Sequence, residues 1–549
     1  MATQAADTET SSDRKVADMQ HVEEQVDTGD DSGLSHSVTT DDLTSIIRTS
    51  LWDNKKFLVV SAIVNIANLD YGIDTGMING FQAMPGFLEV FGYADPALAG
   101  GYGISTTVQQ LITSLMSIGM TVATLGAGPI LHRIGRKGGV WLGGFFVFVS
   151  TIMQMLVTSL GALYVSRLFM GFGSGFLLIS SQLYMQEVSP PHLRAFNFSL
   201  YSTWVSIGSL VGAVINNRTA SIEGRASYRI PLGIVITMTV LICVVIIPLP
   251  ETPRHLAVHG NNEKAYKSLR FLRDASYTDL QIRKEMAEIV HAIEVDKQNG
   301  DSVTFLDIFR HGNARRTMTS IGLAAFNAAS GSQFIIQYGV YFFSVSNNGS
   351  AFRSTVIVFC CGLIGALVSY LYAGRAGKRR VLMIGSALQG FWMLGMGVAY
   401  SADGLNKTAT NTILAMTCLF MFTFCAMCVP FSWLVASEIP NQQLRAHTVG
   451  IASAVSFGLA FVLTFTVPYF LNPTALNWGP RYAYIWVPSN WLCTAFVFFC
   501  VPETRNRTLE EIDEAYVTGV PIRKFQTFRA VGAIQARHDA AHADKQAAQ

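Results

Sequence analysis

Two aspartates, Asp70 and Asp74, lie near the outer end of an apolar run that begins at Phe57. A charged side chain in hydrocarbon costs roughly 3 kcal/mol on insertion scales, so such a residue normally faces a partner or a water-filled path. The spacing of four residues places both carboxylates on one face of a helix, one turn apart. The alternative is that the apolar run ends near Ala67 and both aspartates are solvated. The number of other membrane-spanning segments decides between the two interpretations.

The composition indicates a membrane protein. Of the 549 residues, 50% are hydrophobic and only 14% are charged, and the mean hydropathy is +0.34. Such a low charge with positive hydropathy is typical of chains that face lipid. Most of the charge lies in residues 1–56, 250–316 and 502–549. The net charge of +2, without a basic patch interleaved with aromatic residues, gives no support for a nucleic-acid partner.

Apolar runs long enough to cross a bilayer, about 20 residues each, recur along the chain. We expect an all-α membrane protein with twelve transmembrane helices in two pseudo-symmetric six-helix bundles, at 57–249 and 317–501. A disordered acidic tail (1–56), a linker with short amphipathic helices (250–316) and a second tail (502–549) complete the domain prediction. The predicted spans are 57–80, 103–131, 139–158, 162–186, 198–216, 230–249, 317–343, 352–373, 381–401, 412–437, 448–471 and 482–501.

The short loops predict the orientation. Loops 132–139 and 374–380 are rich in Lys and Arg, whereas loops 81–102 and 159–161 contain neither. By the positive-inside rule, both tails and the linker are cytoplasmic, and we expect a multi-pass protein of the plasma membrane. The sequons at Asn217 and Asn406 would then face outside, where they could be glycosylated.

The chain lacks the patterns of several other functional classes. All eight cysteines fall in apolar runs, which argues against a disulfide framework, and the Cys425–Cys428 pair has no second pair or histidine that would indicate a metal site. The sequence contains no GxxxxGK[ST] or HExxH motif, and no nucleophile, base and orienting residue form a recognisable set. We therefore expect no enzyme activity, no metal and no cofactor.

The two halves repeat each other at a spacing of about 250 residues, which is typical of a fold built from duplicated units. IGRKGG near 134 corresponds to AGKRRV near 376, and EVSPPHLRA (187–195) corresponds to EIPNQQLRA (438–446). LPETPR (249–254) corresponds in the same way to VPETRNR (501–507). This regularity makes solvated loops a poor interpretation of the charges in these segments.

From about Phe57 to Tyr516 the sequence resembles the sugar-porter branch of the major facilitator superfamily. The resemblance rests on YGIDTGMINGFQAMPGFLEVFG (71–92), RLFMGFGSGF (167–176) and the duplicated motifs above. Within that branch, SYRIP (227–231), SEIPNQQLRAHTVGIA (437–452), YFLNPTALNWG (469–479) and VPETRNRTLEEIDE (501–514) look like fungal maltose and α-glucoside permeases. The resemblance implies an importer that is driven by a proton gradient and holds a small sugar, glycoside or polyol between its two bundles. We expect it to work in the lipid bilayer as a monomer.

Asp74 and Arg167 are predicted to lie at a similar depth in the membrane. Asp74 lies about 25 Å along the first span, a few ångströms below the outer hydrocarbon boundary, and Arg167 of the fourth span sits at a similar depth. A change in their pairing would switch Asp74 between proton-bound and free forms, so we predict Asp74 as the proton-coupling site and Arg167 as its partner. The resemblance implies the same roles. The alternative is a static ion pair that holds two helices together.

Charges at the cytoplasmic ends predict a gate. Opposite charges at one depth, duplicated by pseudo-symmetry, would latch the inner mouth and release when the bundles rock. Sugar porters usually carry an aspartate in each short loop, where this chain has His132 and Gly374, so this carboxylate of the latch is missing from both halves. The predicted gate residues are Arg136, Lys137, Glu187, Arg194, Glu251, Lys378, Arg379, Glu438, Arg445 and Glu503.

The seventh span carries amide and hydroxyl side chains suited to a sugar, and Gly331 would let its backbone unwind. Trp433 matches a tryptophan of the family, while Asn327-Ala328 and Ser202 stand where hexose porters carry glutamines. A larger glycoside or another hydroxylated molecule therefore fits better than tightly bound glucose. Each polar residue could instead bond a neighbouring helix. The predicted substrate residues are Asn327, Ser330, Gln333, Gln337, Tyr338, Trp433, Ser202 and Trp204.

Three functions remain open from the sequence. The first is proton-coupled uptake of a sugar or α-glucoside. The second is movement of another polyhydroxylated compound, including export of a fungal metabolite, which the loss of the seventh-span glutamine pair motivates. The third is a non-transporting sugar receptor.

Overall fold

The computed structural model describes residues 55–528 except 95–100, 190–193, 275–276, 301–304, 311–312, 346–349, 373–375, 404–405, 442–443, 473–474, 506 and 508. The chain divides into two units, Met1–Thr49 and Ser50–Gln549. The predicted tail at 1–56 therefore falls almost entirely outside the described residues. The helices and strands below all belong to the second unit.

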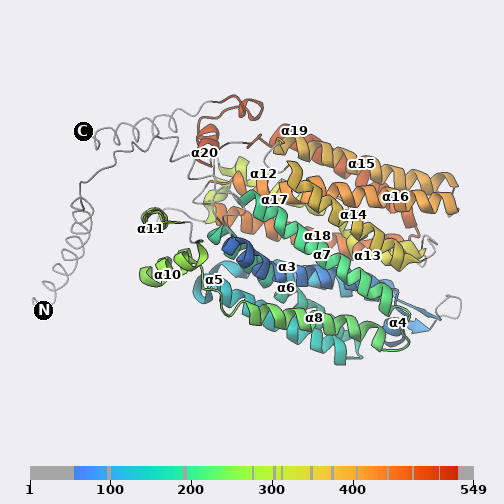
Figure 1. Ribbon diagram of the computed structural model, residues 1–549. Helices are drawn as coiled ribbons and strands as arrows, with labels where there is room; N and C mark the ends of the chain where they lie inside the picture. The colour runs from blue at the N-terminus through green and yellow to red at the C-terminus, as the bar shows by residue number, and fades with distance from the viewer. Residues whose placement is uncertain are drawn as a thin grey trace, which may run out of the picture. The chain divides into compact units, whose positions relative to one another are not determined.

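The first half supplies five long helices, which lie side by side in Figure 1. They are α3 (Lys55–Phe81), α5 (Thr106–Leu156), α6 (Leu160–Val188), α7 (Arg194–Thr219) and α8 (Ala226–Val245). Each begins and ends within a few residues of a predicted span, except that α5 covers both the second and the third.

Helix α5 has 51 residues, and a straight helix of that length would be about 75 Å long, more than twice the thickness of the hydrocarbon core. It bends at Gly135, whose φ of +81° is favourable only for glycine. Both parts of α5 then pack on α6: Gly119 lies against Leu168, and a Cβ atom at Gly143 would be 2.8 Å from the carbonyl oxygen of Gly173. Helix α5 therefore supplies two spans.

The second half contains α14 (Ala351–Tyr372), α15 (Lys378–Asp403), α18 (Arg445–Leu471), α19 (Ala483–Cys500) and two interrupted spans. The seventh span is broken into α12 (Asn313–Ala328) and α13 (Ser332–Val345). Gly331, between them, has a φ of +88°, and a Cβ atom there would lie 2.7 Å from Met393 and from Trp486. The predicted unwinding at Gly331 is confirmed, because no larger residue fits this backbone or this space.

The tenth span changes its helical type in the middle. Helix α16 (Lys407–Thr423) continues into the π-helical turn η4 (Phe424–Cys428) and then into α17 (Val429–Glu438). Pro430 lacks the N–H that an α-helix would direct to the residue four positions earlier, and a π turn accommodates such an interruption. The span predicted at 412–437 is present, and the π turn within it is a feature that the sequence analysis did not predict.

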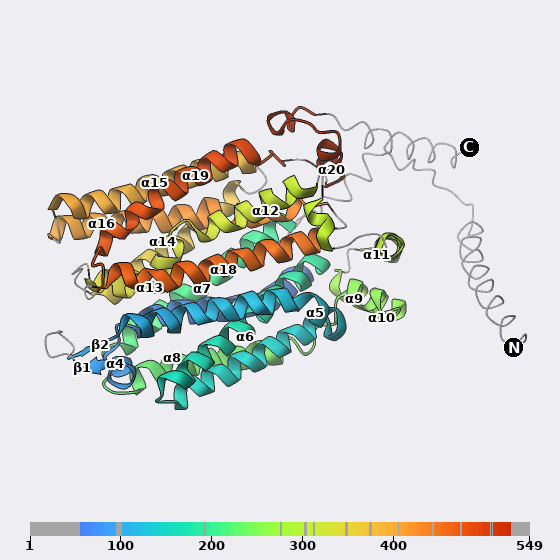
Figure 2. The ribbon, with the colours of Figure 1, turned by 180° about the vertical axis from the view of Figure 1, so that it is seen from behind.

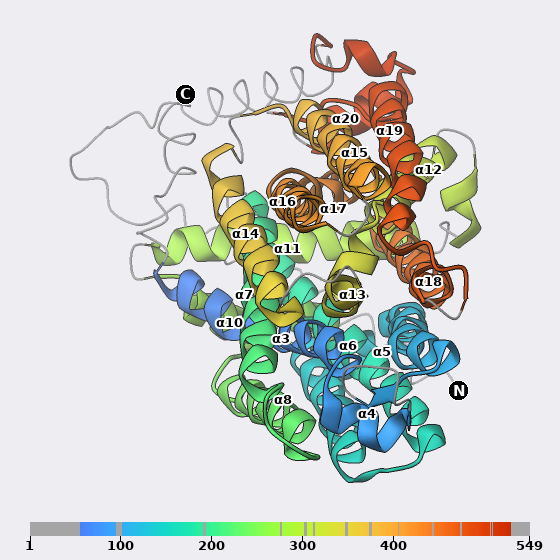
Figure 3. The same cartoon turned by 90° about the vertical axis from the view of Figure 1, so that its right-hand side faces the viewer.

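Among the described residues, nine helices are long and apolar enough to cross a membrane. The bent α5 provides two spans, and α7 and the pair α12–α13, which are not among the nine, complete the twelve. Viewed along the helices, α3, α5, α6 and α8 form one group and α15, α16, α17 and α19 another, with α7, α13, α14 and α18 between them (Figure 3). The first group together with α7 belongs to the first half of the chain, and the second group together with α13, α14 and α18 belongs to the second half. Each half is one bundle.

Short elements cover the two ends of the helices (Figures 1 and 2). One end, which we call the α4 end, carries α4 (Pro85–Phe91) and the antiparallel strands β1 (Tyr93–Ala94) and β2 (Tyr102–Gly103), the small exception to an all-helical fold in the described part. The opposite end, the α10 end, carries α9 (Pro253–Val258), α10 (Asn262–Leu272), α11 (Asp279–Gly300) and α20 (Leu509–Val517). The short 3-10 helices are η3 (Phe305–Phe309), η5 (Gly479–Tyr482) and η6 (Ile522–Lys524).

Candidate functional site

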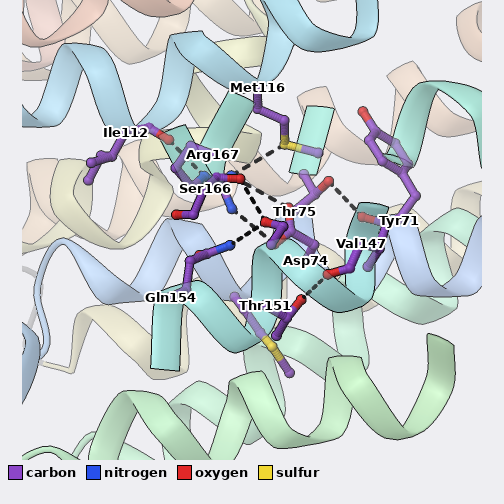
Figure 4. Close-up of polar contacts among 12 residues, drawn as sticks. Tyr71, Asp74, Thr75, Ile112, Met116, Val147, Thr151, Gln154, Ser166 and Arg167 are labelled. Carbon is purple, nitrogen blue, oxygen red and sulfur yellow. Dashed lines mark hydrogen bonds and ion pairs between the residues drawn. The ribbon is translucent and has the colours of Figure 1, made fainter. Parts of the chain in front are cut away.

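Asp74 and Arg167 form an ion pair inside the first bundle (Figure 4). Arg167 Nη1 lies 3.1 Å from Asp74 Oδ1, and Nη2 lies 3.5 Å from Oδ2. Both residues are buried, with 1% of Arg167 and 3% of Asp74 exposed. The sequence argument from helix depth thus places the two side chains correctly, and the solvated alternative for the aspartates is wrong.

The guanidinium of Arg167 is also held by α5. Its Nε donates to the carbonyl oxygen of Ile112 at 2.9 Å, and its Nη2 lies 3.3 Å from the sulfur of Met116 (Figure 4). The pair therefore joins α3, α5 and α6. Because a buried charge without its partner is strongly destabilising, any movement that separates Asp74 from Arg167 requires a proton or another ion to compensate.

Asp70 lies one turn before Asp74 but has a different neighbour. Its Oδ2 accepts a hydrogen bond from Thr239 Oγ1 of α8 at 3.1 Å, and only 2% of the residue is exposed. The two carboxylates thus belong to different helix contacts, although they share one face of α3. Sequence alone left the surroundings of Asp70 open.

A cavity of about 180 Å³ lies between the two halves and contacts helices from both. Among the described residues, no Asp, Glu, Lys, Arg or His lines it. Its polar lining residues are Tyr71, Thr75, Ser117, Gln182, Tyr201, Ser202, Ser206, Ser209, Asn327, Gln333, Gln337, Ser453 and Ser456. Apolar residues, including Trp433, complete the walls. Such a mixture of hydroxyl, amide and apolar groups suits a neutral ligand.

Five of the eight residues predicted to hold substrate line this cavity: Ser202, Asn327, Gln333, Gln337 and Trp433. Asn327 Nδ2 also donates to Ser432 Oγ at 3.0 Å, whereas Gln337 Oε1 is buried and has no hydrogen-bond partner among the described residues. An acceptor in that position is available to a ligand hydroxyl.

The other three predicted residues do not line the cavity. Ser330 instead stabilises the break in the seventh span, since its hydroxyl donates to the Asn327 carbonyl oxygen at 2.9 Å. Tyr338 is fully buried, and its hydroxyl donates to the Thr464 carbonyl oxygen at 2.7 Å. Trp204 lies on α7 outside the lining. Of the three, Tyr338 bonds to the neighbouring helix α18 and Ser330 bonds within the turn between α12 and α13, which the residue types alone do not reveal.

Several lining residues were missed from the sequence. Ser206 and Ser209 follow the predicted Ser202 on α7 at spacings of four and three, which places all three on one helical face, and this stripe of serines could have been recognised. Tyr71 and Thr75 of α3 flank Asp74 in the sequence, and Gln182 comes from α6. Their orientation toward the second half depends on how α3, α6 and α7 pack.

The ion pair and the cavity are neighbours. Met116 lines the cavity and contacts Arg167, and Thr75 of the lining follows Asp74 directly in α3. A ligand that moves Met116 or α3 therefore acts on the environment of the ion pair.

At the α4 end, hydrogen bonds close the two halves against each other. Asn79 of α3 donates to the carbonyl oxygen of Ile336 at 2.8 Å and accepts from the Val340 N–H at 2.6 Å, both on α13. Asn472, which follows α18, donates to Thr106 of α5 at 2.8 Å. Both contacts join the first half to the second.

At the α10 end, the first half carries a charged cluster around Arg136. Arg136 Nη2 lies 2.6 Å from Glu187 Oε1, and Thr252 Oγ1 donates to the other carboxylate oxygen of Glu187 at 2.5 Å. Glu251 accepts from the backbone N–H groups of Arg136 and Lys137 at 3.1 Å each. Since these N–H groups begin the helix that follows Gly135, Glu251 caps it with a negative charge. Burial raises the pKa of Glu251, against the lowering effect of these hydrogen bonds.

The second half repeats this cluster. Lys378 Nζ lies 2.6 Å from Glu438, and Thr504 Oγ1 donates to Glu438 at 2.9 Å. Glu503 accepts from the Lys378 N–H, at the start of α15, at 3.0 Å. The sequence repeat thus places Glu438 where Glu187 stands, and Glu503 where Glu251 stands.

The contacts found at the two clusters lie within one half each, so here they brace each bundle rather than bridge the two. Lys137 Nζ donates to the carbonyl oxygens of Ile247 and Leu249, and Arg379 donates to that of Phe498. Arg445 begins α18, while the side chain of Arg194 and the whole of Gly374 lie outside the described residues. The latch remains a prediction.

His132, in the place of the expected aspartate, lies beside other histidines of the first cluster. Its ring centroid is 5.1 Å from that of His259, which is 4.4 Å from that of His255. Arg136 Nη1 lies 2.8 Å from His255 Nδ1. Burial, together with Arg136 and the two other histidines, lowers the pKa of His255 to about 4.

The two sequons differ in their surroundings. Asn217 lies partly buried in the last turn of α7, whereas Asn406 is exposed just before α16. Their glycosylation stays a prediction.

The family model described as "Sugar (and other) transporter" matches residues 60–516. The chain belongs to this family. A major facilitator-type transporter, ecdD of Aspergillus rugulosus, is 30% identical over 475 residues, which cover 84% of this chain and 87% of that protein. A probable glucose transporter of Neurospora crassa is 29% identical, with 84% and 79% covered, and a high glucose sensor of Saccharomyces cerevisiae is 29% identical, with 85% and 61% covered.

Solved structures support the same fold. The proton:xylose symporter XylE with a bound bromodeoxyglucose has a TM-score of 0.71 at 19% identity and covers 84% of this chain and 100% of its own. The predicted all-α fold with twelve spans in two bundles is confirmed, and members of this family are transporters rather than enzymes. The relatives named here are a major facilitator-type transporter, a probable glucose transporter and a glucose sensor, and none is a maltose or α-glucoside permease. The comparisons therefore support the sugar-transporter family and not that narrower group.

Proposed function

We propose that this chain carries a neutral sugar or α-glucoside across the membrane together with a proton, by alternating access. The observation on which the proposal rests is the buried ion pair of Asp74 and Arg167 beside a cavity that has no charged lining residue in the described part of the chain. The cavity would hold the substrate, and the ion pair would exchange the proton. The choice of a glycoside rests on the sequence segments that look like α-glucoside permeases, a narrower group than the comparisons support.

The coupling step follows from electrostatics. Arg167 stabilises the ionised form of Asp74 while the pair is closed. When substrate displaces Met116 or α3, the pair loosens, and Asp74 becomes neutral by taking a proton because an isolated carboxylate in this dry site is costly. After the substrate leaves on the other side of the membrane, Asp74 releases the proton to that side and re-forms the pair with Arg167, and the empty carrier then returns.

The two ends of the bundle would act as alternate gates. The Asn79 hydrogen bonds close the α4 end in this structure, and the gate residues at the α10 end brace each half on its own. With the predicted topology, the α10 end faces the cytoplasm, and the structure corresponds to the stage at which the outer gate is shut. Rocking of the halves would exchange the closed ends.

The test is uptake by the purified full-length chain in proteoliposomes with an imposed pH gradient. Asp74→Asn should abolish accumulation driven by the gradient while leaving exchange of substrate without a gradient. Asp70→Asn is the matched control, because it makes the same substitution at the other buried aspartate of α3, which has no ion pair with Arg167. Proton-driven accumulation at the normal level by Asp74→Asn would contradict the proposal.

Movement of a different polyhydroxylated compound, including export, is the second candidate. Asn327-Ala328 in place of the glutamine pair of hexose porters favours it. Reversing the pH gradient in the same vesicles gives the preferred direction. Uptake of any tested compound at a rate above that of empty vesicles would exclude a purely sensing role, such as that named for the yeast relative.

A further inference from the structure

The walls of the cavity are chemically unequal. The cavity-lining residues of α14, α16 and η4 have no side-chain oxygen or nitrogen atoms; sulfur is their only heteroatom. These residues, which we call the apolar wall, are Phe359, Gly362, Met421, Phe424 and Cys425. Val429 of α17 continues the same surface.

The apolar wall is tightly packed from behind. The ring of Phe424 stacks on that of Phe420, which is fully buried, with centroids 6.1 Å apart and an interplanar angle of 9°. A Cβ atom at Gly362 would lie 3.1 Å from Met421 and 3.5 Å from Cys425. A side chain at Gly362 would therefore push against Met421 and Cys425, and without it the rings and sulfur atoms of the wall pack in place as an apolar surface for a ligand.

Hydrogen-bonding groups are concentrated elsewhere in the cavity. Gln333 and Gln337 come from α13 and Asn327 from α12, while α7 adds its stripe of serines. Gln337 Oε1 is buried and unpartnered within the described chain. We call these residues of α7, α12 and α13 the polar wall. They can form hydrogen bonds with the hydroxyl groups of a ligand, whereas the apolar wall has no oxygen or nitrogen side-chain atoms for such bonds.

A free hexose does not match this division. Its hydroxyl groups surround the ring, so those facing the apolar wall would lose water without gaining a protein partner, which weakens binding. A charged ligand would enter a cavity without a counter-charge among the described lining residues. A neutral molecule with one hydroxylated part and one apolar part satisfies both walls.

We infer that the preferred substrate is a neutral glycoside or polyol with an apolar substituent, an aromatic ring or branched aliphatic group, that packs on the apolar wall. The hydroxylated part would bind Gln333, Gln337 and Asn327. This inference rests on the proposed function, because it assigns the substrate class of the same cavity.

The test compares probes that differ only in their apolar part. Binding of phenyl α-glucoside, methyl α-glucoside and glucose to the full-length chain in nanodiscs is measured by calorimetry, and their uptake is measured in proteoliposomes. We expect phenyl α-glucoside to bind at least roughly tenfold more tightly than methyl α-glucoside, because the ring adds buried apolar area. Equal affinities, or tighter binding of glucose, would overturn the inference while leaving sugar transport intact.

Two variants locate the effect on the apolar wall. Phe359→Ala and Met421→Gln should weaken phenyl α-glucoside binding by roughly tenfold and methyl α-glucoside binding by less than about twofold. Leu367→Ala is the matched control for the first, since Leu367 lies on the same helix α14 with 52% of its surface exposed. An equal loss for both glucosides would overturn the assignment. No binding or uptake of any sugar or glycoside would instead contradict the proposed function itself.

Discussion

A side-chain carbon at Gly135 would collide with the carboxylate of Glu251. The same relationship recurs in the second half, where Gly377 lies against Glu503. In both halves the glutamate accepts hydrogen bonds from the backbone that follows the glycine. The duplicated sequence motifs therefore encode a duplicated helix cap, in which a distant carboxylate is held at a helix start.

Replacing Gly135 with alanine should destabilise the first cluster. Alanine is strained at a φ of +81° and would displace Glu251, so we expect a loss of about 1–3 kcal/mol in stability. Thermal melting of the purified protein measures the change. Gly128→Ala on the same helix is the control, because nothing lies within 4 Å of a Cβ atom there. Equal melting temperatures of the two variants would contradict the prediction.

Breaking the buried ion pair of Asp74 and Arg167 should destabilise the protein more than removing both of its charges. Asp74→Asn leaves the Arg167 charge buried without its partner, and we expect about 3–5 kcal/mol of destabilisation. Adding Arg167→Gln to this variant should restore much of the loss, since neither charge is then buried alone. Melting temperatures of the single and double variants test this, and a double variant no more stable than Asp74→Asn would argue against strong coupling.

Loss of the buried acceptor of Gln337 should weaken substrate binding. Gln337→Leu removes the group that has no hydrogen-bond partner in the described chain, and a ligand hydroxyl would then lie unpaired. We expect roughly 10- to 100-fold lower affinity for the transported compound. Gln526→Leu makes the same chemical change at an exposed position at the α10 end and should bind normally. Unchanged affinity in Gln337→Leu would place the substrate elsewhere.

Asn79 should control closure of the α4 end. Asn79→Ala removes the hydrogen bonds to α13, so we expect a larger population with that end open. Spin labels at Glu89 and Lys407, in a background without native cysteines, report the distance between the halves there. Asn216→Ala is the control, because Asn216 bonds to Gly76 and Met77 within the first half. Identical distance distributions in the two variants would count against this role.

The first cluster should weaken on acidification. His255 has its pKa lowered from 6.5 to about 4, so it is neutral at pH 7 and accepts the hydrogen bond from Arg136. Between these two pH values the unfolded chain binds the proton and the folded chain does not, so stability falls as the pH drops from 6.5 toward 4. The other charged and titratable groups at this site are His132, His259, Glu187 and Glu251.

Melting temperatures at pH 7 and pH 5 measure this effect. His255→Asn retains an acceptor for Arg136 but cannot titrate, so the difference between the two pH values should shrink. The control variant His447→Asn, which changes an exposed histidine of α18, should leave it unchanged. A full pH difference in His255→Asn would assign the effect to other groups.

Much of this architecture was predictable from the sequence because lipid imposes simple rules. Apolar runs of about 20 residues predicted the membrane spans, and the internal repeat predicted two bundles. Gly331 predicted where the seventh span is interrupted. Asp74 and Arg167 could be predicted to meet, because the rise per residue of a helix gives the depth of each side chain in the membrane and the two depths are similar. These features depend on local sequence and on the membrane thickness alone.

The tertiary structure decided which way each polar side chain turns. Ser330 and Tyr338 looked as suitable for a substrate as Gln333 and Gln337. The hydroxyl of Ser330 instead bonds within the turn between α12 and α13, and that of Tyr338 bonds to α18, whereas the two glutamines line the cavity. In the same way, α8 supplies Thr239 to Asp70, and the charged clusters close within each half. Sequence determined what could cross the membrane and at what depth. Only the rotation and packing of the helices determined which groups meet, because that depends on contacts between segments far apart in the chain.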